Sequence, residues 1–147
     1  MKICIWRYKD NPRNYPGYHL SADAEGCRDL RERLSQIRNS AVFSLTRPDA
    51  GVLSVPNNQG GSARFFAGQK LQVHTGSSLP PDTFRWEEQD TTFILTCSRE
   101  QIARFLAGVA DIEKGDGDYS IRSGDDQALW FWWQVTNPKR MKKANKS

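Results

Sequence analysis

The sequence predicts a single-domain α+β fold, in which an antiparallel or mixed sheet of about six to seven strands carries two amphipathic helices on one face. Apolar residues recur at helical spacing in two segments, whereas most of the chain between them alternates with a period of two. The expected order is β-α-β-β-β-β-β-α-β, which lacks the regular alternation of a doubly wound fold. A chain of 147 residues is most simply one domain, expected over residues 1–136.

The first third of the chain is expected to hold a strand, a helix and a hairpin. Residues 2–8 are rich in β-branched and aromatic side chains, and a loop with prolines and Gly17 follows them. Ser21 is then a suitable N-cap for a helix over about residues 22–38. Its apolar stripe consists of Ala24, Cys27, Leu30, Leu34 and Ile37. The segments "AVFSLT" and "GVLSV" predict a hairpin around "RPDAG".

The rest of the chain is expected to form further strands around a second helix. "ARFFAGQKLQVH" predicts a strand broken near Gly68, and "TFRWEE" with "TTFILTC" predicts a hairpin joined by Gln89–Asp90. Ser98 and Gln101 form a capping box for the second helix, and Gly115 suits its C-terminal end. A short strand near residues 119–122 and a last strand over 128–135 complete the fold.

The run "LWFWW" at residues 129–133 raises the main functional question. Neighbouring residues of a strand face opposite sides, so Leu129, Phe131 and Trp133 are expected under the helices. Trp130 and Trp132 then lie on the helix-free face, together with Trp6 of the first strand. We call Trp6, Trp130 and Trp132 the second aromatic group. Because the first and last strands are apolar on both faces, we expect them near the sheet centre, side by side.

Two interpretations of the second aromatic group stay open at this point. In the first, the rings form a minor core covered by the "YPGY" loop or by the turn at residues 56–62. In the second, they form an open platform for a partner, because contiguous exposed aromatic residues mark interaction sites. The second interpretation motivates the functional hypothesis.

The positive charge of the chain is concentrated at its C-terminal end. The formal net charge is +4, but residues 137–147 contain five cations and no acid. Without this segment, which we expect to be a disordered basic tail, 16 cations stand against 17 anions. The body is therefore nearly neutral, and nucleic-acid binding by the fold itself is only weakly indicated.

The sequence contains no catalytic signature, and we predict no catalytic residue, metal ion or cofactor. "DGDYSI" begins like a calcium-binding loop, but Ile121 stands where that loop needs glycine. His19 and His74 are not at metal-ligand spacing with any cysteine. Cys27 and Cys97 occupy apolar positions, where a buried thiol is the usual outcome.

The leading hypothesis is a non-enzymatic module that binds another protein, such as an inhibitor, an immunity-type protein or a subunit of a larger assembly. Its candidate binding residues are Trp6, Tyr8, Tyr15, Tyr18, Trp130 and Trp132, with the acidic Asp116 and Asp118. One alternative is a single-stranded nucleic-acid-binding protein that combines stacking with phosphate contacts. Its cationic candidates are Arg7, Lys9, Arg13, Lys139, Arg140, Lys142 and Lys143. Another alternative is a small cofactor-free enzyme whose groups converge from scattered positions.

The compartment is expected to be the cytoplasm. Three widely spaced cysteines do not suggest a disulfide framework, and the N-terminal segment is charged rather than apolar. We expect no membrane association, because no run approaches the roughly 20 apolar residues of a spanning helix. The sequence leaves the oligomeric state open.

Overall fold

A computed structural model of the chain describes residues 1–9, 16–53, 64–115, 119–122 and 127–132. Its strands are β1 (Ile3–Tyr8), β2 (Tyr18–Ala22), β3 (Ser40–Ser44), β4 (Phe65–Ala67), β5 (Lys70–His74), β6 (Phe84–Gln89), β7 (Thr92–Cys97), β8 (Tyr119–Ile121) and β9 (Leu129–Trp132). Its helices are α1 (Ala24–Ser35), α2 (Ala50–Leu53) and α3 (Arg99–Glu113). The predicted tail at 137–147 lies outside the described residues.

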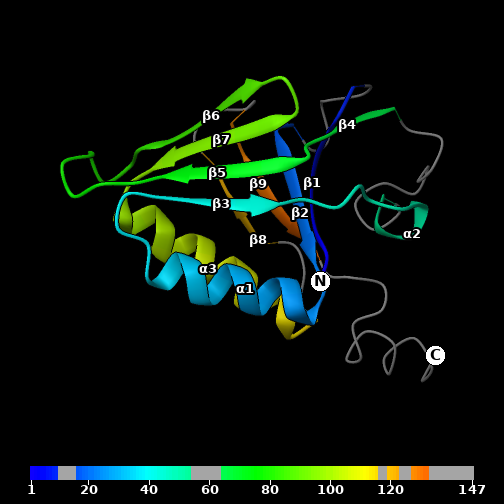
Figure 1. Ribbon diagram of the computed structural model, residues 1–147, viewed down its shortest axis with the longest axis horizontal. Helices are drawn as coiled ribbons and strands as arrows, with labels where there is room; N and C mark the ends of the chain where they lie inside the picture. Colours follow the sequence, from blue (N-terminus) through cyan, green and yellow to red (C-terminus); the bar gives the residue numbers. More distant parts are fainter. Residues whose placement is uncertain (10–15, 54–63, 116–118, 123–126, 133–147) are drawn as a thin grey trace.

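The strands form two mixed sheets rather than one. A five-stranded sheet has the order β4-β1-β2-β9-β8, and a four-stranded sheet has the order β3-β5-β7-β6. Helices α1 and α3 lie side by side beneath the four-stranded sheet, and β1, β2 and β9 pass behind the end of β3 (Figure 1). The α+β class is confirmed, but the prediction of a single sheet with six to seven strands is wrong.

The chain changes sheets at Gly68, where the sequence predicts the break in a strand. β4 pairs with β1 on one side of this residue, and β5 pairs with β3 and β7 on the other. A Cβ atom at Gly68 would lie 2.7 Å from the ring of Phe93. The crossing is therefore tight enough to require glycine.

One large core lies between the two sheets and the two long helices. Every element except β4 and α2 contributes buried side chains to it, and Phe66 of β4 packs against it. Leu129 and Phe131 face this core, as predicted, and Phe131 meets Phe105 of α3 edge to face with ring centroids 5.3 Å apart. Trp133, the third residue expected on this face, lies outside the described residues.

Strand β2 was not predicted, and it occupies the middle of the five-stranded sheet. It pairs antiparallel with β1 and parallel with β9, so the first and last strands are separated rather than adjacent. Its residues alternate cleanly: Leu20 faces the large core, whereas His19 and Ser21 face the opposite side. Three alternating core positions, Tyr18, Leu20 and Ala22, in a five-residue strand after a loop are too weak a signal for sequence analysis to detect.

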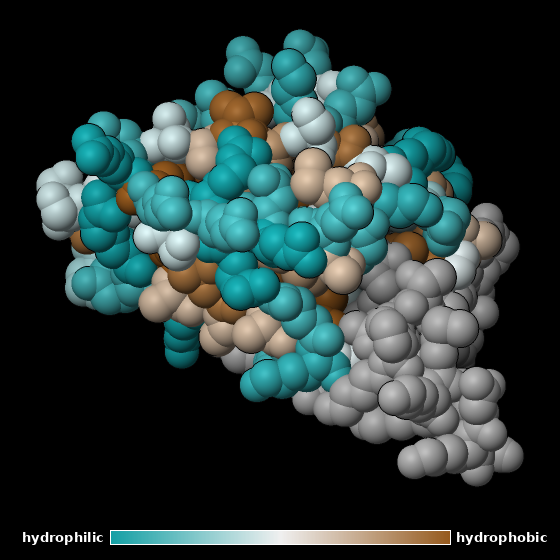
Figure 2. Space-filling model, turned by 60° about the horizontal axis from the view of Figure 1, so that its bottom comes forward, coloured by the Kyte–Doolittle hydropathy of each residue, from teal (hydrophilic) through white to brown (hydrophobic). Residues whose placement is uncertain are grey.

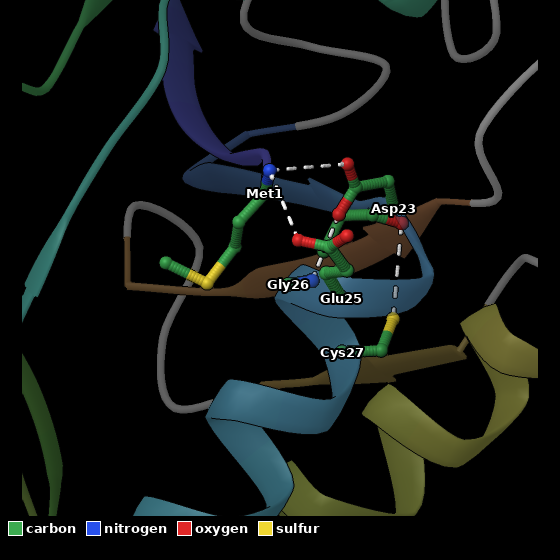
Figure 3. A network of polar contacts seen from close by, with 6 residues as sticks. Met1, Asp23, Glu25, Gly26 and Cys27 are labelled. Atoms are coloured by element: carbon green, nitrogen blue, oxygen red, sulfur yellow. Dashed lines mark hydrogen bonds and ion pairs between the residues drawn. The ribbon is translucent and has the colours of Figure 1, made fainter.

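Helix α1 begins after Asp23, not after Ser21. Asp23 Oδ1 accepts a 2.8 Å hydrogen bond from the Gly26 amide, whereas the buried Ser21 hydroxyl donates to the Trp132 carbonyl. The start of the helix packs closely on β1, since a Cβ atom at Gly26 would lie 2.3 Å from the Lys2 carbonyl oxygen. Figure 3 shows the Met1 amino group against Asp23 and Glu25 at this helix start.

The predicted hairpin over residues 41–55 does not form. Residues 40–44 form β3, which pairs antiparallel with β5, and residues 50–53 form the short helix α2. Asp49 fixes the start of α2, because its carboxylate accepts from the Val52 amide at 2.9 Å. This cap outweighs the strand-like composition of "GVLSV".

Helix α3 agrees best with the prediction. The Ser98 hydroxyl accepts from the Gln101 amide at 3.2 Å and donates to the Pro81 carbonyl at 2.6 Å. Gly115 has the positive φ expected just after the helix. Only half of the predicted capping box forms. The Ser98 amide donates to the Thr83 carbonyl instead of to the Gln101 side chain, and the Gln101 Oε1 atom is buried without a hydrogen-bond partner.

On both edges of the four-stranded sheet, side chains form hydrogen bonds with backbone groups of the edge strand. On β3, the Arg33 guanidinium donates to the Val42 carbonyl. On β6, the Trp86 amide donates to Gln127 Oε1 at 2.6 Å. Each contact uses a polar backbone group that an added strand would need, which protects the edges against strand addition.

Gly108 on α3 provides a test of how closely this helix packs on β9. We expect Gly108→Ala to destabilise the protein by about 1–3 kcal/mol, because the new Cβ would lie 2.6 Å from the Phe131 ring. In an exposed helix the same change stabilises by about 1 kcal/mol. Gly76→Ala is the control, since nothing lies within 4 Å of its Cβ position. Urea unfolding measures both, and equal stability of the two variants would contradict the packing.

Candidate binding surfaces

The second aromatic group is closed. Trp6, Trp130 and Trp132 are 0%, 8% and 3% exposed. They form a second buried cluster with Cys4, Val52, Leu53 and Ala128. The prediction of an open platform is therefore wrong, and the alternative, a minor core, is confirmed. The unpredicted helix α2 brings Val52 and Leu53 onto these rings, and the Pro16 carbonyl of the "YPGY" loop accepts from Trp130 Nε1 at 2.9 Å.

His19 lies inside this second core. Its ring stacks between Trp6 and Trp132, with centroid distances of 5.5 and 6.2 Å. Trp132 Nε1 donates to His19 Nδ1 at 2.9 Å, so the imidazole is neutral and carries its proton on Nε2. A fully buried histidine in this role orients an indole in the core, which is a structural function.

The two other described tyrosines of the predicted site also have internal roles. The Tyr8 hydroxyl donates to the Leu53 carbonyl at 3.1 Å, which ties β1 to α2. Tyr18 is buried in the large core, where its ring stacks on Trp86 with centroids 4.4 Å apart. Neither ring forms part of an aromatic platform. Tyr15, Asp116 and Asp118 lie outside the described residues.

A charged cluster of Arg7, Glu88 and Tyr18 joins the two sheets. Arg7 Nε and Nη2 donate to the two Glu88 carboxylate oxygens at 2.7 and 3.1 Å, and the Tyr18 hydroxyl donates to Oε2 at 2.6 Å. Burial acts to raise the pKa of Glu88, but the hydrogen bonds from Arg7 and Tyr18 outweigh it and leave that pKa below its usual value. The bond to Glu88 also raises the pKa of Arg7.

The cationic residues predicted for nucleic-acid binding are not brought together in the described part of the chain. Arg7 is engaged by Glu88, and its guanidinium also lies over the Phe66 ring at 5.0 Å. Lys9 is exposed beside it in sequence, and its backbone amide donates to the Arg64 carbonyl. Arg13, Lys139, Arg140, Lys142 and Lys143 lie outside the described residues.

The three cysteines are poor nucleophiles. All are free and buried, and desolvation raises the pKa of each thiol to about 12. Cys27 additionally donates to the Ala22 carbonyl at a sulfur–oxygen distance of 3.7 Å. Buried thiols with such pKa values act as small apolar side chains at neutral pH.

On the outer side of the four-stranded sheet no described helix or strand is packed, since the buried side chains of its inner side join the large core with those of α1 and α3 (Figure 1). We call this outer side the open face. Cross-strand pairing arranges its side chains in three rows: Ser40, His74, Thr96 and Arg85; Val42, Gln72, Ile94 and Glu87; Ser44, Lys70, Thr92 and Gln89. The central row is the most apolar, and its Val42 is 47% exposed. The period-two alternation of these strands separates their two faces, but the pairing of distant strands was needed to define the rows.

Figure 2 shows the opposite, helical side of the molecule. Hydrophilic residues cover most of its coloured surface, and brown and tan residues gather mainly in a band across its lower part. The outer side of α1 fits this description, with Arg28, Glu32 and Arg33 exposed. Among the described residues, the helices carry no large hydrophobic side chain in the exposed class, which is found only at Met1 and Val42.

A pocket of about 320 Å³ lies at the N-terminal end of α3. Pro81, Asp82, Glu100, Gln101 and Arg104 line it. The hydrogen bond from Ser98 to the Pro81 carbonyl holds the turn before β6 against the helix start. We call this pocket, lined by residues 81, 82, 100, 101 and 104, the α3 pocket. Sequence analysis missed it because its two lining segments are 18 residues apart and meet only through this tertiary contact.

The described segments hold neither a metal-binding cluster nor a membrane-spanning helix. These segments contain no cluster of three or more histidine, cysteine, aspartate or glutamate side chains able to hold a metal ion. They also contain no helix with the length and apolar character needed to cross a bilayer.

Comparison with known proteins identifies no relative: no protein-family model, curated protein or solved structure matches the chain. The proposals that follow therefore rest on the side chains and surfaces of this protein alone.

Replacing Glu88 by glutamine tests the charged cluster between the sheets. We expect Glu88→Gln to destabilise the protein by about 1–2 kcal/mol at neutral pH, because Arg7 and Tyr18 lose a charged acceptor. Glu87→Gln on the open face is the matched control and should change little.

The effect should depend on pH in one direction. The pKa of Glu88 is lowered in the folded protein, so its contribution is present above the usual glutamate value of 4.5 and disappears as the pH falls through the lower folded value. Unfolding curves of wild type and Glu88→Gln should therefore converge in acid. A constant difference across this range would contradict the assigned role of the carboxylate.

Iodide quenching tests the closure of the second aromatic group. We expect Trp130→Phe and Trp132→Phe each to remove emission that iodide does not quench, because both indoles are buried. Steady-state fluorescence of the two single variants measures this. Loss of a large quenchable fraction in either variant would show that the rings are open to solvent.

Proposed function

We propose that the protein is a non-enzymatic, cytoplasmic protein-binding module that docks through the open face. The observation that carries this proposal is the central row of the open face, in which Val42, Gln72 and Ile94 lie side by side. This row runs from an exposed valine on the edge strand β3, through Gln72 on β5, to a partly buried isoleucine on β7, and it lies between two more polar rows. An apolar centre with a polar rim is the usual arrangement of a protein interface.

The blocked edges support binding by the face rather than by strand addition. Arg33 and Gln127 occupy backbone groups on β3 and β6, so an added strand would first have to displace them. Among the described residues, no such contact is made across the open face. A partner would therefore contact side chains of several strands at once.

The charges of the open face favour an acidic partner surface. Lys70 and Arg85 lie in the two outer rows, whereas Glu87 is the acid of the central row. Both cations are exposed. A partner that offers carboxylates on either side of an apolar strip would complement this pattern and be steered toward it. Such chemistry suits an inhibitor, an immunity-type protein or a subunit of a larger assembly.

Site-specific photo-crosslinking tests the proposal. A photoreactive amino acid in place of Ile94, expressed in the native source, should give one discrete crosslinked protein, because Ile94 lies in the central row. The same amino acid in place of the exposed Glu32 on α1 is the control and should not give this product. Addition of Val42→Asp to the Ile94 variant should reduce the yield about tenfold or more, because it places a charge in the apolar centre.

Two results would contradict the proposal. The first is a product of the same size from both positions 94 and 32, which would indicate random collisions. The second is a product from position 94 that is insensitive to Val42→Asp, in a variant whose unfolding transition is unchanged.

A further inference from the structure

Two cations face each other where the ladder of β1 and β4 ends. The Lys9 amide donates to the Arg64 carbonyl at 2.9 Å, one step beyond the cross-strand pair of Tyr8 and Phe65. Lys9 and Arg64 are therefore directly opposite each other, and their side chains leave the sheet on the same side with Cβ atoms about 5 Å apart. We call these two residues the cation pair. Both are exposed, and like charges in this arrangement are destabilising, so an anion bound between them would remove an unfavourable contact.

Acidic side chains that reach this end of the sheet already have partners. On the side of β1 that carries the cation pair, Glu88 accepts hydrogen bonds from Arg7 and Tyr18. On the opposite side, Asp49 caps the short helix α2. Among the described residues, no ion pair involves Lys9. The charge of Lys9 is therefore not neutralised by any acid in the described part of the chain.

Strand β4 adds two aromatic rings, and an arginine lies over each of them. Phe66 is on the side of the cation pair, and the Arg7 guanidinium carbon is 5.0 Å from its ring centroid. Phe65 is on the other side, with the Arg47 guanidinium carbon 4.6 Å from its centroid. Both rings are partly exposed, and β4 forms an edge of the five-stranded sheet. Cations and aromatic rings are thus interleaved along one sheet edge, as in proteins that bind single-stranded nucleic acids. We call Lys9, Arg47, Arg64, Phe65 and Phe66 the β4 edge.

We propose that the β4 edge binds single-stranded nucleic acid through its phosphate groups. A phosphate between Lys9 and Arg64 accepts from an ammonium and a guanidinium, and charge-assisted bonds of this kind are about twice as strong as neutral ones. Arg47 is exposed and offers a flat guanidinium on which a base stacks. Of the cations that the sequence predicts for this function, only Lys9 belongs to the edge, and tertiary contacts add Arg47 and Arg64. The site goes beyond the proposed function, since none of its residues belongs to the open face.

Other anionic partners fit the edge less well. The carboxylates of an acidic peptide would neutralise the cation pair, but they would leave the stacking surfaces without a partner. Duplex DNA offers phosphates, but its bases are already paired and stacked on one another, whereas a single strand exposes their faces. Strand β4 has only three residues and follows the charged Arg64, which makes it a poor template for an added peptide strand.

Fluorescence anisotropy of a labelled oligothymidylate of about 12 nucleotides tests the site in the full-length protein. Lys9→Gln and Arg64→Gln should each weaken binding about fivefold and lower the slope of log Kd against log salt concentration by about 0.7, because each removes one phosphate contact. Arg28→Gln is the matched control, since it removes an exposed cation from the outer side of α1, and it should change both values little. The control is needed because the five cations of residues 137–147 attract any polyanion.

Urea unfolding provides a readout that separates binding from folding. Lys9→Gln should leave the free protein as stable as wild type or slightly more stable, because it removes a like-charged neighbour of Arg64. A purely structural lysine would instead lose stability on the same change. Competition with an unlabelled single strand, a duplex of the same length and polyglutamate then ranks the partner classes, and the single strand should displace the probe at the lowest concentration.

Three results would overturn the proposal. The first is an equal effect of the Lys9, Arg64 and Arg28 changes, which would assign the binding to net charge. The second is displacement of the probe by the duplex or by polyglutamate as effective as by the single strand. The third is a loss of stability in Lys9→Gln large enough to account for its weaker binding. None of these depends on crosslinking at the open face, so the two proposals fail separately.

Discussion

The fold depends on the requirement that the five-stranded sheet be covered on both of its faces. Its three central strands, β1, β2 and β9, carry apolar or aromatic side chains at both odd and even positions. Ile5, Leu20 and Phe131 enter the large core, while Trp6, His19 and Trp132 enter the second one. A shift of one residue in any of these strands would exchange the two sets, so the pairing register is strongly specified.

The covering of each face has a different origin. The four-stranded sheet and helices α1 and α3 cover one face, and the crossing at Gly68 together with the Arg7–Glu88–Tyr18 cluster ties the two sheets together. On the other face, α2 supplies Val52 and Leu53. Because the rings of the second aromatic group are used in this way, they are not part of the binding surface that we propose on the open face.

Sequence analysis succeeded where the pattern is local. The stripe and Ser98 cap of α3, the hairpin of β6 and β7 and the opposite orientation of neighbouring tryptophans all follow from short-range spacing, although the turn of that hairpin lies at residues 90–91, one residue later than predicted. It failed where long-range contacts decide. β2 is stabilised by parallel pairing with β9 more than 100 residues away, and α2 forms in a strand-like segment capped by Asp49. The wrong prediction that Trp130 is exposed follows from missing α2. Alternation along a strand predicts which side of the sheet a residue faces, but not which element covers that side.

Exchange of the indole N–H hydrogens tests the closed second core most directly. The account predicts that Nε1–H of Trp132, bonded to His19 inside a buried cluster, exchanges with deuterium only when the protein unfolds. NMR with single Trp-to-Phe variants for assignment measures its rate, and that rate should follow the free energy of global unfolding as urea is added. Exchange as fast as that of a solvent-exposed indole, and independent of stability, would contradict the account.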